Sequence, residues 1–333
     1  MRIWIPILVL AVVAGCQSLA YYTQAVGGHF DVLSRARPVS DWLADPATPP
    51  ELRARLETAR HIREFASKSL GLPDNGSYLS YASIDRPYVV WNVFAAPELS
   101  VEPKLECFPF AGCVSYRGFY SEDDARRHAE RLREAGYDVY VGGVPAYSTL
   151  GWTDDPLLST FIRYPDAQLA RLVFHELAHQ LVYVKNDTTF NESFAVTVEE
   201  EGVRRWLEAE KRPGELAAFS SAQARKRDLA ERVSQARERL KAVYASEVGR
   251  EQKLEQKRAE WQRLRAAYPA LPAEPNNAFL ASIAVYTELV PAFERLLAES
   301  GSLEAFYRRV KDLARDPSAR EAYFTTAGYR RSS

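Results

Sequence analysis

The sequence lacks both a long apolar run and an excess of charge of one sign. A helix that crosses a membrane needs about 18 to 20 consecutive apolar residues, and no segment of the 333 residues approaches that length. The 43 Lys and Arg residues nearly balance the 44 Asp and Glu residues, which leaves a formal net charge of −1. We therefore expect a soluble body with neither a nucleic-acid partner nor broad electrostatic adhesion to anionic lipid.

Methionine, cysteine and histidine are also scarce, with one, three and five residues respectively. The single Met is the first residue and carries no functional message. Cys107 and Cys113 lie close in the sequence with no His nearby, which argues against a zinc knuckle. In an exported protein a short loop closed by a disulfide is the better interpretation, so we predict a bond between these two cysteines.

The first residues have the pattern of an export signal. Met1-Arg2 precedes an apolar run from Ile3 to Ala14, and small residues stand directly before Cys16. This run is too short to span a bilayer comfortably, and it resembles a bacterial lipoprotein signal peptide. We predict cleavage before Cys16 and lipidation of its thiol, which would tether the protein to the membrane. A plain cleaved signal and an uncleaved anchor are the alternatives.

The residue after this cysteine bears on the destination of the protein. Gln17 is not the Asp that resembles an inner-membrane retention signal. We therefore predict a lipid-anchored protein of the bacterial cell envelope, in the outer membrane and facing the periplasm.

Two of the five histidines stand four residues apart in an apolar segment that contains no Gly or Pro. On a helix His175 and His179 would project from one face, so both imidazoles could bind the same cation. Glu176 is rotated from His175 by about 100° and would reach beside the metal rather than onto it. This arrangement predicts one Zn²⁺ ion, with Glu176 as the general base that acts on an activated water.

A catalytic zinc usually has three protein ligands, so a third is required. The polar segment that ends at Phe190 predicts a turn into a second helix, which places Glu192 near its start as the expected ligand. The spacing from Thr189 to Glu192 also fits a capping box that involves no metal. Glu199, two turns farther on the same face, is predicted to orient a ligating histidine.

These two motifs carry a family resemblance. HELAHQ followed by NESFA resembles the HExxH and NEGFA pair of gluzincin aminopeptidases, although the segment between the motifs is shorter than in the large cytosolic members. The whole chain resembles a family of bacterial lipoproteins identified as predicted zinc aminopeptidases. That wider resemblance rests on Val90-Trp91-Asn92-Val93, Cys107-Phe108-Pro109, Tyr116-Arg117-Gly118, the run from Ala146 to Trp152, and Asn276-Asn277-Ala278. It implies a zinc site at His175, His179 and Glu192, with Glu176 as general base, and aminopeptidase activity on peptides.

We expect an α+β fold with a gluzincin-like core, a small mixed β-sheet, catalytic helices and a long C-terminal helical hairpin. Along the chain we predict a signal peptide (1–15), an N-terminal helical segment (16–73), a β-rich subdomain (74–155), the zinc helices (156–212) and a C-terminal helical region (213–333). Within these segments the patterns predict helices at 50–70, 122–135, 276–297 and 303–313, strands at 78–82, 88–94, 112–116 and 138–141, and a hairpin over 213–268 broken at Gly249.

The segment before the zinc helices is the predicted substrate side. Residues 147–150 are expected to form an edge strand, and such an edge can hold an extended peptide by strand addition. Tyr147, Ser148 and Thr149 are therefore candidate substrate-binding residues, with Asp154 and Asp155 near the cleft. A structural turn capped by Asp is the alternative interpretation.

The tetrahedral intermediate of peptide hydrolysis needs a hydrogen-bond donor. Tyr286 is the first candidate and Tyr147 the second, with Asn276 and Asn277 as further polar groups; a Tyr on a helix is otherwise a packing residue. Exopeptidase action also needs an acid that binds the free amino group of the substrate. The candidates for that acid are Asp154, Asp155 and Glu200.

Three functions remain compatible with the sequence. The first is a zinc aminopeptidase that acts on peptides in the periplasm. The second is an endopeptidase that acts on envelope proteins with the same chemistry in an open cleft. The third is an envelope scaffold lipoprotein whose zinc is structural and whose hairpin recruits protein partners.

Overall fold

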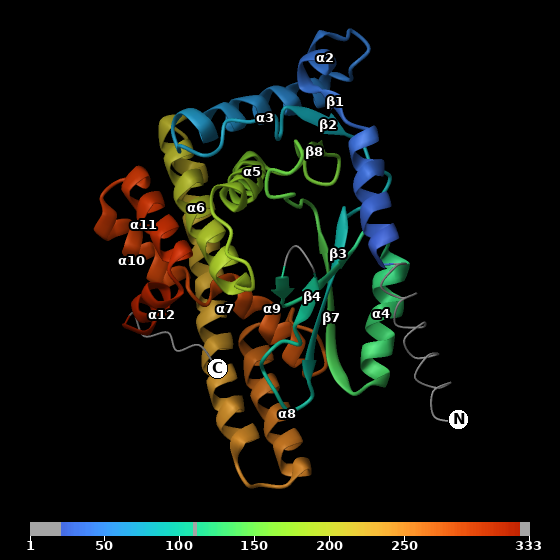
Figure 1. Cartoon of the computed structure of the whole chain (residues 1–333), viewed down its shortest axis with the longest axis vertical. Helices are drawn as coiled ribbons and strands as arrows, with labels where there is room; N and C mark the ends of the chain where they lie inside the picture. The colour runs from blue at the N-terminus through green and yellow to red at the C-terminus, as the bar shows by residue number, and fades with distance from the viewer. Residues whose placement is uncertain (1–20, 109–111, 327–333) are drawn as a thin grey trace, which may run out of the picture.

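The computed structural model describes residues 21–108 and 112–326 (Figure 1). Within these residues the chain forms a mixed α+β fold that is mainly helical and contains three small sheets. No helix of the described part combines the length and apolar composition that a membrane crossing requires. The predicted signal peptide and Cys16 lie outside the described residues.

Two neighbouring helices form the centre of the molecule. Helix α5 (Asp166–Leu181) packs along α6 (Thr188–Ala209). A Cβ atom at Gly202 would lie 2.7 Å from the ring of Phe174, so the absent side chain is what lets the two helices approach closely. The main hydrophobic core surrounds this pair and takes buried side chains from Val32 to Phe324. It therefore joins all four segments predicted after residue 16 into one packed body.

Other helices enclose the central pair. In Figure 1, α3 (Pro50–Lys68) crosses α5 at one end, while α10 (Val290–Ser300) and α11 (Leu303–Arg315) lie along the other side of α6. The structure confirms the predicted helices at 50–70 and 303–313 to within a few residues. The short helices α2 (Val39–Ala44) and α12 (Pro317–Thr326) lie in the two segments predicted to be helical, although their bounds were not predicted.

The larger antiparallel sheet has the strand order β6-β3-β7 and lies between helices. Its strands are β3 (Val90–Pro97), β6 (Arg117–Phe119) and β7 (Tyr137–Val144). Trp91, Val93 and Ala95 pack against α4 (Glu122–Glu134), whereas the alternate residues Phe94 and Ala96 pack against α9 (Asn277–Thr287). This alternation follows from the two-residue period of a strand. Both faces of β3 are consequently buried.

Two further sheets are short. One joins β1 (Arg37–Pro38), β2 (Ser80–Ala82) and β8 (Leu157–Leu158), and the other pairs β4 (Glu106–Phe108) with β5 (Gly112–Val114). Cys107 lies opposite Cys113 in the β4–β5 pair, and the two form a disulfide. The predicted pairing of these cysteines is therefore present in the structure.

The predicted helical hairpin is also present. Helices α7 (Pro213–Ala245) and α8 (Arg250–Ala267) pack together, and Gly249 is the N-cap residue of α8. Lys257 of α8 is buried and its ammonium lies 2.7 Å from the Asp138 carboxylate of β7. The same carboxylate accepts a hydrogen bond from the Asn277 backbone N–H at the start of α9. This buried contact attaches the hairpin and α9 to the sheet.

Two predicted elements are wrong. Residues 147–150 form no strand, because Pro145 has no N–H to give to a neighbouring strand and the Thr149 N–H is donated to the Asp155 side chain at 2.9 Å. The predicted helix over 276–297 is divided into α9 and α10. Pro291 lies in the first turn of α10 and has no N–H that could continue the hydrogen bonding of α9. The first turn of a helix tolerates proline, because an N–H at that position has no partner within the helix.

Candidate active site

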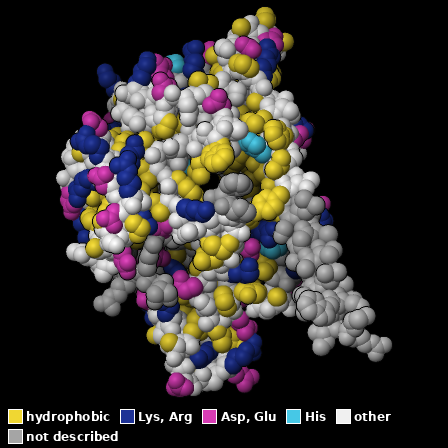
Figure 2. Space-filling view, viewed as in Figure 1, with side chains coloured by type: hydrophobic (Ala, Val, Ile, Leu, Met, Phe, Trp, Pro, Cys, Tyr) yellow, Lys and Arg dark blue, Asp and Glu magenta, His cyan; other side chains and the backbone are white. Residues whose placement is uncertain are grey.

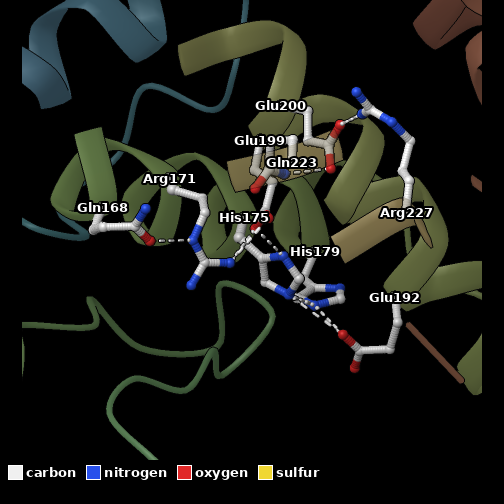
Figure 3. Close-up of polar contacts among 9 residues, drawn as sticks. All are labelled: Gln168, Arg171, His175, His179, Glu192, Glu199, Glu200, Gln223 and Arg227. Carbon is white, nitrogen blue, oxygen red and sulfur yellow. Dashed lines mark hydrogen bonds and ion pairs between the residues drawn. The ribbon is translucent and has the colours of Figure 1, made fainter. Parts of the chain in front are cut away.

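Helix α5 presents its two histidines side by side within the core. His175 and His179 are each 8% exposed, and their Nε2 atoms lie 3.1 Å apart (Figure 3). Neighbours Phe174, Leu177 and Ala178 are fully buried and fix the helix in place. The spacing of four residues therefore produces the predicted pair of imidazoles on one face.

The turn between α5 and α6 brings Glu192 to this pair. Asp187 is the N-cap of α6 and accepts a hydrogen bond from the Phe190 N–H at 3.1 Å. The Asn191 side-chain amide accepts from the Val184 N–H at 2.7 Å and donates to the Val184 carbonyl at 2.8 Å, which closes the turn. Glu192 thus lies beyond the capping position, and the capping-box interpretation does not apply.

The three side chains converge on one point. The Glu192 Oε2 atom is 3.3 Å from His175 Nε2 and 3.6 Å from His179 Nε2. All three candidate ligand atoms lie within 4.8 Å of one another. Zn–N bonds of about 2.0–2.1 Å in tetrahedral geometry place two ligating nitrogens about 3.3 Å apart, close to the spacing seen here. The group can therefore bind a metal ion without rearrangement of the backbone.

The hydrogen bonding of the group also favours a cation. Glu192 Oε2 is buried and accepts no hydrogen bond from the described residues. Because a carboxylate cannot donate, the His175 Nδ1–H must be the donor in its 2.8 Å hydrogen bond to Glu199, which leaves Nε2 directed at Glu192. Burial alone would lower the pKa of His175, but Glu192 and Glu199 outweigh it and raise that pKa to about 10, so a positive charge, either a proton or a metal ion, is stabilised at this position. Two imidazoles and one carboxylate form a donor set that suits zinc.

Glu199 orients His175 as the sequence predicted. Its carboxylate also accepts hydrogen bonds from Arg171 at 2.9 and 3.1 Å, and Arg171 in turn donates to Gln168 at 3.0 Å (Figure 3). Burial alone would raise the pKa of Glu199, but Arg171 and His175 outweigh it and hold that pKa below its usual value. Glu199 thus stays ionised and fixes the ring orientation of His175.

The other two carboxylates of the centre differ in character. Burial raises the pKa of Glu176, which is not part of the candidate ligand group. For Glu192, burial acts in the same direction, but the two histidines outweigh it and lower the pKa to about 2. Glu192 is therefore ionised and available as a ligand, whereas Glu176 has the stronger affinity for a proton that a general base requires.

A cavity of about 460 Å³ adjoins the centre. The face seen in Figure 2 is hollowed near its middle, with hydrophobic side chains gathered around the opening. The predicted site residues that line this cavity are His175, Glu176, His179, Glu192, Tyr147, Ser148 and Tyr286. The structure thus brings together residues from α5, α6, α9 and the loop after β7.

Several lining residues were missed at the sequence level. They come from the sheet, from the loops and from the helical segment 21–34, and they are Asn92, Tyr116, Gly118, Tyr120, Tyr183, Tyr21 and Tyr22. Asn92, Tyr116 and Gly118 belong to segments that carry the family resemblance, and this was the one signal available for them. Together with Tyr147 and Tyr286, the lining contains seven tyrosines.

Tyr286 has the properties expected of a hydrogen-bond donor in this cavity. Burial and the nearby Glu192 carboxylate raise its pKa well above the usual value. Tyr116 responds in the same way to burial and to Glu192. Both phenols therefore stay protonated near neutral pH. Tyr147 instead forms a 2.8 Å hydrogen bond through its hydroxyl to His29 Nδ1.

The candidate acids for an amino terminus lie elsewhere. Asp155 is 1% exposed, and its carboxylate accepts hydrogen bonds from the Thr149 N–H and from Gln180 rather than facing the cavity. Asp154 and Thr149 are likewise absent from the described lining. Glu200 pairs with Arg227 at 2.9 Å, outside the cavity (Figure 3). The Asp-capped turn is therefore the interpretation that the structure supports.

The two C-terminal asparagines also have structural roles. Asn276 is the N-cap of α9 and donates a hydrogen bond to the Val139 carbonyl at 2.9 Å. The Asn277 side chain donates to the Glu98 carbonyl at 2.9 Å. Both asparagines hold α9 on the sheet, and neither is among the residues found to line the cavity.

Comparison with known proteins gives one match. A family model described as "Putative aminopeptidase" matches residues 20–324, a range that includes both zinc motifs, the sheets and the helices through α11. No curated protein and no solved structure matches the chain. The chemistry of the site therefore has to be inferred from its own geometry.

The contact between Glu199 and His175 leads to a prediction about metal affinity. Glu199→Gln removes the charge that holds the His175 ring, so we expect zinc affinity to fall about 10- to 100-fold. Competition against a chromophoric chelator measures the affinity. Glu201→Gln is the matched control, because Glu201 pairs on the same helix with Arg204 and Arg205. Equal affinities for the two variants would exclude the orienting role.

Proposed function

The chain belongs to the family described as "Putative aminopeptidase", and we propose that it is a zinc-dependent peptidase with a gluzincin-like centre that removes amino-terminal residues from peptides. The observation that carries this proposal is the convergence of His175, His179 and Glu192 while Glu176 stays outside the ligand group. This division between three ligands and one free carboxylate is what metal-assisted hydrolysis requires.

In the proposed mechanism the protein moves one proton and stabilises one developing charge. Zinc held by the three ligands would supply a Lewis acid that lowers the pKa of water and polarises a carbonyl. Glu176 accepts the proton of the attacking water, whose oxygen bonds to the scissile carbonyl carbon. Tyr286 donates a hydrogen bond to the developing oxyanion. Glu176 then delivers the proton to the leaving amine as the C–N bond breaks.

The surroundings of the centre support a catalytic rather than a structural metal. Structural zinc sites have four protein ligands and no open position. Here the described residues supply a group of three, and a cavity of about 460 Å³ adjoins it. Space for a substrate next to the ligands has no purpose in a scaffold protein. The peptidase proposal is therefore preferred to a scaffold lipoprotein with structural zinc.

An endopeptidase is the second candidate function, and one observation favours it. Glu176 and Glu192 are the only carboxylates among the described residues that line the cavity. In the proposed mechanism Glu192 is a metal ligand and Glu176 is the general base, so neither is free to bind the amino group of a substrate. Family membership favours the aminopeptidase and the lining favours the endopeptidase, and only the substrate can decide between them.

We also propose that the protein is a lipoprotein of the cell envelope, anchored through Cys16. The lipobox-like sequence before Cys16 supports this proposal. The disulfide between Cys107 and Cys113 supports export in addition, because disulfides persist in oxidising compartments.

The role of Glu176 gives the first prediction for this function. Glu176→Gln keeps the shape of the side chain but cannot accept the proton, so we expect kcat to fall about 10²- to 10⁴-fold while zinc content stays unchanged. Zinc is measured by atomic emission, and hydrolysis is measured on peptides with free and with acetylated amino termini. Preference for free termini supports the aminopeptidase, and equal rates support the endopeptidase. Undiminished turnover in the variant would remove Glu176 from the mechanism.

The phenol of Tyr286 provides a separate test. Tyr286→Phe removes one hydroxyl and keeps the ring that packs in the cavity, so we expect kcat to fall about 10²- to 10³-fold with little change in KM. Steady-state kinetics with the preferred peptide measure both constants. Tyr140→Phe is the control, since Tyr140 packs in the same aromatic cluster but does not line the cavity. Equal kinetics for the two variants would assign Tyr286 to packing.

Lipid anchoring is tested through Cys16. In cells fed radiolabelled palmitate, we expect the wild-type protein to carry label and to sediment with membranes. Cys16→Ser should lose both properties, whereas the double variant Cys107→Ser, Cys113→Ser should keep the label. An unlabelled wild-type protein would contradict the proposal.

A further inference from the structure

One polar side chain in the cavity has no role in the mechanism above. Asn92 lies in β3, whose other residues are apolar, and is 7% exposed. Because side chains alternate along a strand, Asn92 faces the same side as Phe94 and Ala96, which pack against α9. Tyr286 of α9 packs on this same side of the sheet. Asn92 accordingly lines the cavity together with the metal-binding residues.

The amide of Asn92 has no partner among the residues that the structure describes. Among the described residues its side chain makes no hydrogen bond or ion pair, although buried polar groups are nearly always satisfied. The amide atoms of Asn92 are not among the described polar atoms that are both inaccessible and without a partner. Since Asn92 lines the cavity, its amide is open to the cavity. A buried amide that is free and open to a cavity is available to bind a ligand.

The neighbouring strands keep this amide accessible. Asn92 lies opposite Gly118 of β6 and opposite Gly142 of β7. A Cβ atom at Gly118 would lie 3.1 Å from Val90 Cγ1 and 3.2 Å from Asn92 Oδ1, so a larger residue there would crowd both the Val90 side chain and the amide. A Cβ atom at Gly142 would instead meet the Tyr140 ring, at 3.3 Å. Only Gly118 also lines the cavity.

The surroundings of the amide indicate what it binds. No Lys or Arg is present among the described lining residues, and the two carboxylates belong to the metal centre. Burial raises the pKa of Tyr116 and of Tyr286, so these two phenols stay neutral. A charged ligand group beside Asn92 would therefore lose its hydration without compensation. The natural complement of a primary amide, with one acceptor oxygen and two donor hydrogens, is another amide.

We propose that Asn92 is a substrate-binding residue whose side-chain amide pairs with a peptide group of the substrate next to the scissile bond. This inference rests on the proposed peptidase function, since a peptide must enter the cavity for the pairing to occur. The substrate class is a polypeptide that presents an uncharged backbone segment to the sheet. Two motifs of the family resemblance, around Asn92 and Gly118, thereby acquire a shared function.

The test combines a protein variant with a modified substrate. Asn92→Ala is compared with wild type on a peptide and on a series in which one non-scissile peptide N–H at a time is replaced by an ester oxygen. Loss of a hydrogen bond to a buried polar group costs about 1–3 kcal/mol, so we expect kcat/KM to fall about 5- to 150-fold for Asn92→Ala with unchanged zinc content. At one position the ester should lower kcat/KM of the wild type by a similar factor and leave kcat/KM of Asn92→Ala almost unchanged.

The two flanking glycines supply matched controls. Gly118→Ala crowds the Asn92 amide and should lower kcat/KM in the same direction, by a smaller factor. Gly142→Ala is also directly opposite Asn92 but does not touch its amide, so its kcat/KM should equal that of wild type. Equal ester effects in wild type and Asn92→Ala at every position would overturn the proposal, as would an unchanged kcat/KM in Asn92→Ala. If Asn92→Ala does not fold, Asn92→Ser replaces it.

Failure of the proposed function can be told apart from failure of this inference. If the wild type hydrolyses no peptide, calorimetry with Glu176→Gln and with the double variant Glu176→Gln, Asn92→Ala measures binding of the same peptides without turnover. If an ester at one position weakens binding to Glu176→Gln but not to the double variant, and the double variant binds the parent peptide more weakly, the Asn92 contact is supported even though hydrolysis fails. Equal binding by the two proteins, or no binding by either, overturns it.

Discussion

The centre depends on the balance of charge around three buried carboxylates. Glu176, Glu192 and Glu199 are at most 8% exposed, and in a medium of low polarity their mutual repulsion is strong. Arg171 supplies one positive charge through its pair with Glu199 at 2.9 Å. The two negative charges that remain match one divalent cation bound by neutral imidazoles. Charge and ligand geometry are therefore both compatible with a divalent cation.

The cavity has two sides that are built by different means. The ligand side is local in sequence, because α5 and α6 are consecutive and Gly202 lets them pack closely. The opposite side is assembled from distant segments, and α9 is held on the sheet by apolar contacts with Phe94 and Ala96 and by the cluster of Lys257, Asp138 and Asn277. Separating the partners of a buried ion pair leaves an uncompensated charge, so arrangements that part Lys257 from Asp138 are disfavoured. Here it fixes the position of Tyr286 relative to the ligands.

This difference explains what the sequence could predict. The grouping of His175, His179 and Glu192, and the contact of Glu199 with His175, follow from helical periodicity across one turn, and the hairpin break at Gly249 is equally local. The position of Asp155 under the loop is not local, because it depends on a hydrogen bond to the Thr149 backbone that competes with strand formation. Likewise, nothing in the spacing of residues 90–97 shows that Asn92 would share a cavity with α9. Pro291, by contrast, was a readable signal for the end of a helix.

The composition of the cavity constrains how the reaction can be accelerated. Its described lining contains phenols and one free amide, and no Lys or Arg. In the proposed hydrolysis, negative charge that develops on the scissile carbonyl must then be stabilised by the cation and by uncharged donors. Such donors act only at hydrogen-bond distance and with the correct direction, whereas a cationic side chain acts over a longer range. The rate of the proposed reaction should consequently depend on how accurately α9 and the sheet are held against α5 and α6, which would give the buried polar contacts around Lys257 a catalytic consequence far from the candidate metal site.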